Sequence, residues 1–318
     1  MSNKNKINPL VSIGMPTYNG SKYIRQALVS LINQSYRNFE LIISDNASTD
    51  NTQIICKEYQ RIDNRIKYIR QEKNVGPIKN FNSVLKKARG EYFMWASDDD
   101  IWYENFIKIL LNSLVGKDNY VVAFCDYIYF GNDSLVRKKL KVKNNLSRIG
   151  RIIDFLDNYQ EMFAALYYGL FKRKALLEIG GIHEDARPYY KAGDFLTMFK
   201  TLLLGEFFHV NKILFKKRDT SGFIFNDYKI LRDLNFSPPV IFRIKRYLVT
   251  PVFILFDFYY LLKFTFKSDL KFPEKLLVSI FCLKGLFKSN LEFISKIFKG
   301  IYYVILGFSE KYLPKFSV

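Results

Sequence analysis

Three consecutive aspartates are the residues of this sequence best suited to chemistry. Asp98, Asp99 and Asp100 directly follow the apolar stretch Tyr92–Ala96. Neighbouring carboxylates destabilise one another unless a cation neutralises them. A hard divalent ion prefers one or two protein carboxylates together with substrate phosphates and water. The triplet therefore predicts a divalent metal site shared with a phosphate-bearing substrate. The alternative is a solvated acidic turn that caps a helix starting at Trp102.

Two earlier polar segments also follow apolar stretches of strand length: Pro16–Gly20 and Asp45–Asp50. Helical patterns separate the stretches, an alternation typical of an α/β fold with a mostly parallel sheet covered by helices. Such sheets bind ligands outside the carboxyl ends of their strands. A nucleotide site is expected there, although the sequence has neither a G-x-G-x-x-G nor a G-x-x-x-x-G-K-[ST] phosphate loop. The predicted strands are Val11–Met15, Phe39–Ser44, Ile66–Ile69 and Tyr92–Ala96, and the predicted helices are Tyr23–Ile32, Thr52–Tyr59 and Ile78–Ala88.

Several motifs occur here in the order and spacing of one known family. They are Val11–Asn19, Leu31–Tyr36, Phe39–Asp50, Asn74–Gly76 and Ala88–Asp100. Together they resemble family 2 glycosyltransferases over about residues 9 to 220. The resemblance implies a GT-A fold, in which helices sandwich a mostly parallel sheet. It also implies a UDP- or dTDP-linked sugar donor, a divalent metal ion (Mn²⁺ or Mg²⁺) and transfer with inversion at the anomeric carbon.

The acceptor implied by the resemblance is a hydroxyl of a glycan or of a lipid-linked acceptor, in cell-surface polysaccharide synthesis. A non-catalytic nucleotide-sugar-binding or scaffold relative is the alternative. Such a relative would keep the fold and lose the carboxylates, whereas the aspartate triplet and Asp194 are intact in this sequence.

The resemblance assigns donor binding to the two earlier polar segments. The residues that match the nucleoside-holding segment are Pro16, Thr17, Tyr18 and Asn19. Asp45 matches the carboxylate that accepts a hydrogen bond from the pyrimidine ring N–H. Many relatives place an Arg directly before the residue matched by Asn82, and this sequence has Phe81 there. The contribution of that Arg is therefore missing or comes from Lys79.

The aspartate triplet matches the family's metal-binding motif with one departure. Asp99 matches the metal-binding carboxylate, Asp100 is the second metal-site residue, and Asp98 assists in nucleotide-sugar binding. The usual motif reads D-x-D-D, and Ser97 occupies its first position. The departure leaves open which residue holds the ribose.

The resemblance also implies an acidic catalytic base that precedes a helix later in the chain. Asp194 opens a run of apolar residues at helical spacing and is the preferred candidate. Glu184 and Asp185 are the alternatives. Relatives often end the next strand with an Arg followed shortly by a His, and this sequence has Arg218 followed by Asp219.

The composition changes near Pro238. The 82 residues from Ser237 onward hold 19 Phe and Tyr, and 13 Lys and Arg against 5 acidic residues. We therefore expect a catalytic domain over residues 1–236 and a helical, amphipathic region over residues 237–318. The apolar run Tyr247–Leu262 is shorter than the roughly 20 residues that span a bilayer. Association with an anionic membrane surface is expected, and packing as a helical subdomain or a homo-oligomer is the alternative.

The net charge of +19 favours polyanionic partners. Nucleic acid is not expected among them, because the motif-bearing half has acidic loops where a polyanion would have to bind. The polar residues before Val11 show no signal peptide. Three scattered Cys do not provide a disulfide framework. A cytoplasmic location is therefore expected, peripheral on the inner face of the cell membrane.

Overall fold

The computed structural model describes residues 8–131, 134–138, 140, 142, 146–183, 192–218 and 258–283. The chain divides into two compact units, Met1–Ser221 and Gly222–Val318, and each unit is described by itself. The domain boundary predicted between residues 236 and 237 lies outside the described residues.

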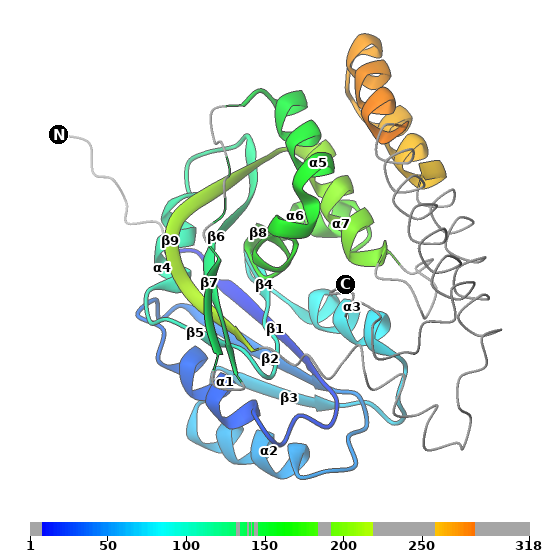
Figure 1. The fold of residues 1–318 in the computed structure, drawn as a ribbon. Coiled ribbons are helices and arrows are strands. Elements are labelled where there is room, and N and C mark those ends of the chain that lie inside the picture. Colours follow the sequence, from blue (N-terminus) through cyan, green and yellow to red (C-terminus); the bar gives the residue numbers. More distant parts are fainter. Residues whose placement is uncertain are drawn as a thin grey trace, which may run out of the picture. The chain divides into compact units, whose positions relative to one another are not determined.

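The first unit is built on one sheet (Figure 1). The strands are β1 (Val11–Thr17), β2 (Phe39–Asp45), β3 (Ile66–Arg70), β4 (Tyr92–Trp95), β5 (Ile101–Trp102), β6 (Tyr120–Gly131), β7 (Ser134–Lys138), β8 (Leu170–Lys172) and β9 (Glu206–Arg218). The helices are α1 (Ile24–Ile32), α2 (Thr52–Ile62), α3 (Pro77–Lys87), α4 (Phe106–Asn112), α5 (Arg148–Tyr167), α6 (Arg173–Glu178) and α7 (Ala192–Leu204). Within the described residues, the strand order is β3-β2-β1-β4-β8-β6-β9-β5, with β7 paired to β6.

The α/β fold class predicted from the sequence is confirmed. β1 pairs in parallel with β2 and β4, and β2 pairs in parallel with β3, so the carboxyl ends of these strands meet at one edge. Every residue of β1 and β2 is buried, which is typical of parallel strands covered on both faces. The buried residues of α1, at the spacing of an amphipathic helix, are Ile24, Ala27, Leu28 and Leu31.

The later half of the sheet mixes strand directions. β8 is antiparallel to β4 and β6, whereas β9 is parallel to β6 and antiparallel to β5. The helix cap considered for the acidic triplet is wrong. Ile101 and Trp102 form β5, in which Trp102 lies opposite Phe215 of β9, and α4 begins only at Phe106. Pairing with a strand distant in sequence outweighs the local helical pattern.

A buried carboxylate fastens the parallel strands at their amino ends. Glu40 of β2 accepts hydrogen bonds from Ser12 Oγ at 2.7 Å and from the backbone N–H of Arg89 at 2.8 Å. Lys67 Nζ lies 3.0 Å from its other oxygen. Burial alone would raise the pKa of Glu40, but these donors lower it to about 2. Glu40 therefore connects β1, β3 and the turn that precedes β4 while it is ionised.

The second unit is described for two helical segments, residues 258–267 and 272–283. In the second segment Val278 and Cys282 are buried. Its exposed large apolar residues are Phe272, Leu276, Leu277, Ile280 and Leu283. Their spacing places most of them on one helix face. No helix among the described residues has both the length and the apolar character needed to cross a membrane.

Candidate functional site

Loops from three parallel strands meet at the carboxyl edge of the sheet. Thr17 at the end of β1 donates a hydrogen bond from Oγ1 to Asp98 Oδ2 in the loop after β4. The Thr17 carbonyl accepts a hydrogen bond from the Asn46 N–H at 2.9 Å, in the loop after β2. A Cβ added at Gly20 would lie 2.2 Å from Asp98 Oδ2. A larger residue at position 20 would therefore displace the Asp98 carboxylate or the Thr17 hydroxyl.

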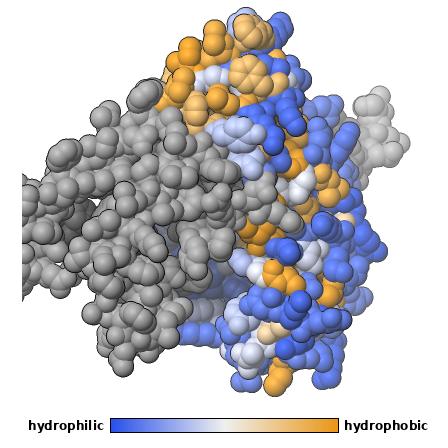
Figure 2. Space-filling view, turned by 90° about the vertical axis from the view of Figure 1, so that its right-hand side faces the viewer, coloured by the Kyte–Doolittle hydropathy of each residue, from blue (hydrophilic) through white to orange (hydrophobic). Residues whose placement is uncertain are grey.

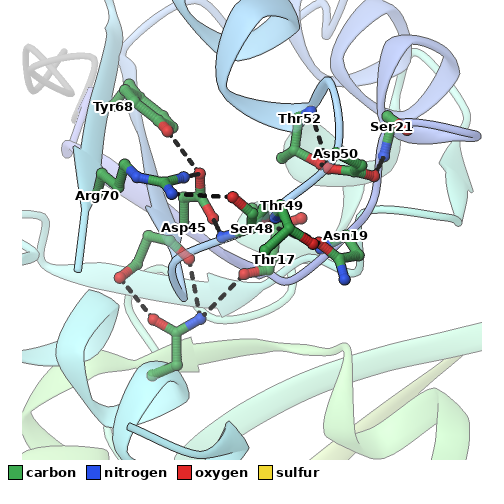
Figure 3. A network of polar contacts seen from close by, with 12 residues as sticks. Thr17, Asn19, Ser21, Asp45, Ser48, Thr49, Asp50, Thr52, Tyr68 and Arg70 are labelled. Atoms are coloured by element: carbon green, nitrogen blue, oxygen red, sulfur yellow. Dashed lines mark hydrogen bonds and ion pairs between the residues drawn. The ribbon is translucent and has the colours of Figure 1, made fainter. Parts of the chain in front are cut away.

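The loops after β1 and β2 are joined by reciprocal hydrogen bonds (Figure 3). Asn19 donates from its backbone N–H to Ser48 Oγ at 2.9 Å and accepts from the Thr49 N–H at 2.8 Å. Asn19 has a φ of 54°, a left-handed conformation that Asn tolerates better than most residues. Tyr18 beside it is 49% exposed. This arrangement leaves an aromatic ring at the surface next to a rigid polar turn.

Asp45 is fully buried and fixed by groups from two elements. Its Oδ1 accepts from the Ser48 N–H at 2.8 Å, and its Oδ2 accepts from Tyr68 Oη at 2.6 Å and from Arg70 Nη1 at 2.9 Å. Figure 3 shows Tyr68 and Arg70 both directed at this carboxylate. The sequence did not single out Tyr68 or Arg70. Side chains alternate between the two faces of a strand, so Tyr68 and Arg70, which are two residues apart on β3, lie on the same face. Both reach Asp45 of the neighbouring strand β2.

The helix that follows Gly76 contributes an amide. Asn80 accepts from Ser44 Oγ at 2.6 Å and donates to the Ser44 carbonyl at 2.9 Å, so it fixes α3 to the end of β2. Lys79, proposed as a substitute for the family Arg, is exposed. The cation that contacts Asp45 among the described residues is Arg70.

The acidic loop combines one buried residue, Asp100, with two half-buried ones, Asp98 and Asp99. Burial raises the pKa of Asp98 to about 7 despite the hydrogen bond from Thr17. Burial also raises the pKa of Asp100 to about 6, against the attraction of Lys217. Asp99 is half-buried and accepts from Ser97 Oγ. Ser97, the departure from the family motif, therefore orients Asp99.

The loop fits a metal that is shared with a ligand. Among the described residues, no three His, Cys, Asp or Glu side chains are grouped to hold a metal ion by themselves. Asp100 Oδ2 is buried and accepts no hydrogen bond in the described part of the chain, so it retains a free lone pair for a cation. One or two carboxylates completed by substrate phosphates are a normal Mg²⁺ or Mn²⁺ environment.

Basic residues at the end of β9 face this loop. Arg218 donates from its backbone N–H to Asp100 Oδ1 at 2.7 Å and from Nε to the Asp99 carbonyl at 2.9 Å. Lys217 Nζ lies 3.7 Å from Asp100 Oδ2. Burial alone would lower the pKa of Lys217, but Tyr168 and the aspartates more than offset it and raise that pKa. The run Lys216-Lys217-Arg218 is visible in the sequence, but its proximity to the triplet is not.

Asp194 lies in the first turn of α7 and is half-buried. Burial raises the pKa of Tyr168, and Asp100, Asp99 and Asp194 raise it further, whereas Lys217 lowers it. Asp194 and the acidic loop thus both act electrostatically on one phenol. The alternative bases Glu184 and Asp185, and Asp219 after Arg218, lie outside the described residues.

Comparison with known proteins agrees with this architecture. The sequence profile of glycosyl transferase family 2 matches residues 12–180. An E. coli relative, the UDP-Glc:alpha-D-GlcNAc-diphosphoundecaprenol beta-1,3-glucosyltransferase WfgD, is 34% identical over 129 residues, which cover 41% of this chain and 50% of that protein. The chain spans only 38 to 41% of the length of several other curated relatives that it matches.

Two solved structures share the fold. TarS from S. aureus in complex with UDP-GlcNAc has a TM-score of 0.63 and 21% identity, over 87% of this chain and 72% of that chain. The mannosyltransferase PcManGT from Pyrobaculum calidifontis, in complex with GDP-Man and Mn²⁺, has a TM-score of 0.51 and 14% identity, over 94% of this chain and 81% of that chain.

The profile match covers more than half of the 318-residue chain, and both solved structures share its fold. The chain therefore belongs to glycosyl transferase family 2, a family of glycosyltransferase enzymes.

Proposed function

We propose that the chain is an inverting glycosyltransferase that moves a sugar from a UDP- or dTDP-linked donor to a hydroxyl of a glycan or lipid-linked acceptor. The process served is cell-surface polysaccharide synthesis. The observation that carries the proposal is the junction of Thr17, Asp98 and the Asp45 loop at one sheet edge. The E. coli relative, whose name specifies a UDP-Glc donor and a diphosphoundecaprenol acceptor, supports both substrate classes.

The donor's nucleoside would lie against the loops after β1 and β2. Pro16, Thr17, Tyr18, Asn19, Lys79 and Asp98 stay the proposed donor-binding residues, together with Asp45. Asp45 would accept the pyrimidine ring N–H. Its three hydrogen bonds and burial hold the carboxylate in one orientation. A buried polar group held in this way discriminates between ligands that can and cannot form a hydrogen bond with it.

The donor's diphosphate would lie at the acidic loop. Asp99 and Asp100 would hold a divalent ion, and such an ion neutralises negative charge on a departing diphosphate. Ser97 keeps Asp99 oriented, and Arg218 fixes the loop backbone through the Asp99 carbonyl. The chain's own part is thus to present two carboxylates in a fixed loop beside Thr17.

Asp194 would act as the catalytic base. The acceptor oxygen attacks the anomeric carbon on the face opposite the diphosphate, the bond from that carbon to the diphosphate oxygen breaks, and the acceptor proton passes to the Asp194 carboxylate. One displacement of this kind inverts the anomeric configuration. A positioned base contributes roughly 10²- to 10⁴-fold to the rate.

To test this function, purified full-length protein is incubated with a panel of UDP- and dTDP-sugars and Mn²⁺, and both donor binding and donor hydrolysis are measured. Metal-dependent hydrolysis of at least one donor is expected, because water replaces the acceptor slowly in such sites. Binding of a donor without any hydrolysis or transfer would favour the non-catalytic relative. Absence of binding to every donor would overturn the proposal.

The second unit is proposed to attach the protein to an anionic membrane surface, on the cytoplasmic face. The helix over residues 272–283 exposes an apolar stripe that includes Phe272, Leu276 and Ile280. Figure 2 shows apolar side chains gathered at the top of the view, with smaller apolar groups elsewhere on the described surface. An exposed apolar face with nearby lysines is typical of helices that lie in a membrane interface. Each basic residue near an anionic surface adds about 1 kcal/mol.

Flotation with anionic vesicles tests this attachment. The variant Phe272→Glu/Ile280→Glu should stay at the bottom of the gradient, whereas the wild type floats. Ile54→Glu is the matched control, because Ile54 is 66% exposed on α2 of the first unit. If the double variant floats as well as the wild type but elutes as a smaller species in size exclusion, the exposed face forms a homo-oligomer instead.

A further inference from the structure

Lys217 reaches the acidic loop from a strand that is distant in sequence. The pairing of Ile101 with Lys216 aligns the end of β9 with β5, which directly follows Asp100. Lys217 Nζ lies 3.7 Å from Asp100 Oδ2 and 4.8 Å from the centre of the Tyr168 ring. The Asp100 side chain is buried, whereas the Lys217 side chain is 24% exposed. Lys217 therefore neutralises a buried carboxylate and stays accessible to a ligand.

The neighbouring Arg218 fixes the acidic loop to two other parts of the first unit. Its Nη2 donates to Gln26 Oε1 at 2.7 Å, in addition to the bond from Nε to the Asp99 carbonyl. Its guanidinium also lies over the rings of Tyr23 and Phe130, at 4.0 and 4.3 Å. Arg218 therefore holds the loop in place through Nε and Nη2.

The Lys217 ammonium is only partly satisfied. It carries three N–H donors, and its distance of 3.7 Å from Asp100 Oδ2 is longer than a hydrogen bond. In the part of the chain that the structure describes, the ion pair and the ring contact are its interactions, and no hydrogen bond completes them. An ammonium in this state would gain from an anionic acceptor within reach of its flexible stem.

We infer that Lys217 exchanges partners when the donor binds: it neutralises Asp100 in the free protein and donates to the donor's diphosphate in the complex. The inference rests on the proposed function. A divalent ion at Asp99 and Asp100 would repel the ammonium at such short range, and the diphosphate would attract it. Lys217 would thus make metal binding and diphosphate binding mutually dependent.

Calorimetry on full-length protein tests this exchange with Mn²⁺ alone, with UDP in saturating Mn²⁺, and with UMP in saturating Mn²⁺. Lys217→Met keeps the length of the side chain and removes its charge. It should bind Mn²⁺ alone more tightly than the wild type, because no cation competes for Asp100. Its affinity for UDP should fall by about tenfold or more, the effect of one charge-assisted hydrogen bond, while its affinity for UMP should change little.

Lys216→Met is the matched control, because Lys216 is the adjacent residue and its Nζ lies over the Tyr103 ring at 5.5 Å. It should bind all three probes like the wild type, and Lys217→Arg should retain most of the UDP affinity. Weaker binding of Mn²⁺ alone to Lys217→Met, or unchanged binding of UDP, would overturn the inference. Failure of the wild type itself to bind either UDP or dTDP would overturn the proposed function instead.

Lysine acetylation of the wild-type protein, read by mass spectrometry, gives a second measurement that does not depend on the folding of a variant. UDP with Mg²⁺ should protect Lys217 from acetylation, UMP with Mg²⁺ should not, and Lys216 should be modified equally in both. Equal protection of Lys217 by UMP and UDP would contradict a contact with the β-phosphate.

Discussion

The side chain of Asn82 holds both backbone polar groups of Ile182. Asn82 Oδ1 accepts from the Ile182 N–H at 2.8 Å, and Asn82 Nδ2 donates to the Ile182 carbonyl at 2.9 Å. Asn82 is buried on α3, whereas Ile182 follows a glycine turn shortly before the start of α7. This pair connects α3 to the segment of the chain that precedes α7.

Replacement of Asn82 by Leu should therefore destabilise the protein. Both backbone groups of Ile182 would lose their partner in a buried site, and each unsatisfied group costs about 1 to 3 kcal/mol. Urea denaturation followed by circular dichroism measures the loss. Asn105→Leu is a suitable control, because the Asn105 side chain bonds Ser35 at an exposed position. Equal stability of the two variants would mean that solvent or another group replaces Asn82.

Replacement of Asp194 by Asn should separate binding from chemistry. The amide keeps the shape of the side chain but cannot take the acceptor proton, so the transfer rate should fall by about 10²-fold or more. Calorimetry should give an unchanged affinity for UDP with Mn²⁺. If transfer persists at the wild-type rate while Glu184→Gln or Asp185→Asn abolishes it, one of those residues is the base.

Replacement of Asp99 by Asn should act before chemistry, because it removes a carboxylate proposed to bind the metal ion. The affinity for UDP in the presence of Mn²⁺ should fall by about tenfold or more, and the affinity in the presence of EDTA should be the same as that of the wild type. Asp118→Asn serves as the control, since the Asp118 side chain is fully exposed. Unchanged Mn²⁺-dependent affinity would remove Asp99 from the metal site.

The Glu40 network predicts how stability depends on pH. The pKa of Glu40 is lowered to about 2 in the folded protein, below its value of about 4.3 in an unfolded chain. Its contribution is therefore present above about pH 5 and is lost as the pH falls toward 2. The free energy of unfolding of the wild type should exceed that of Glu40→Gln by about 1 to 3 kcal/mol at neutral pH, and the difference should shrink on acidification.

Glu58→Gln is the control for this experiment. Glu58 pairs with Arg25 in an ion pair whose side chains are 50% and 46% exposed, and exposed pairs contribute about 0 to 1 kcal/mol. Urea titrations of both variants and the wild type between neutral and acidic pH make the comparison. A pH-independent difference for Glu40→Gln would show that the carboxylate is not ionised in the folded protein.

The first half of the fold could be predicted because its signals are local. Buried parallel strands give continuous apolar runs, so the elements from β1 to β4 follow from the sequence within a few residues. The short strand β5 could not be predicted, because Ile101 and Trp102 are strand only through their pairing with β9. Local patterns favoured a helix there, and a contact between distant segments decided the outcome.

The candidate site also has one part that local sequence patterns predict and one part that depends on contacts between distant segments. Its acidic side follows strand ends that are visible in the sequence, whereas its basic side consists of Arg70, Lys217 and Arg218. Arg70 resembles any charged residue at a strand end, and its bond to Asp45 becomes evident only when β2 and β3 are placed in register. Lys217 and Tyr168 come from elements whose partners no local spacing identifies.

The register between β5 and β9 makes the site sensitive to chain length as well as to side-chain identity. Side chains alternate between the two faces of a strand, so the pairing of Ile101 with Lys216 determines which lysine of the consecutive pair lies beside Asp100. Loss of one residue of β9 directly before Lys216 would shift the run Lys216-Lys217-Arg218 by one position relative to β5, and its composition would stay the same. Among relatives with the same residues, a single deletion would thus inactivate the enzyme. The β6–β9 pairing is irregular near Asp126, and a change in strand length at that point would leave the register of β5 and β9 unchanged.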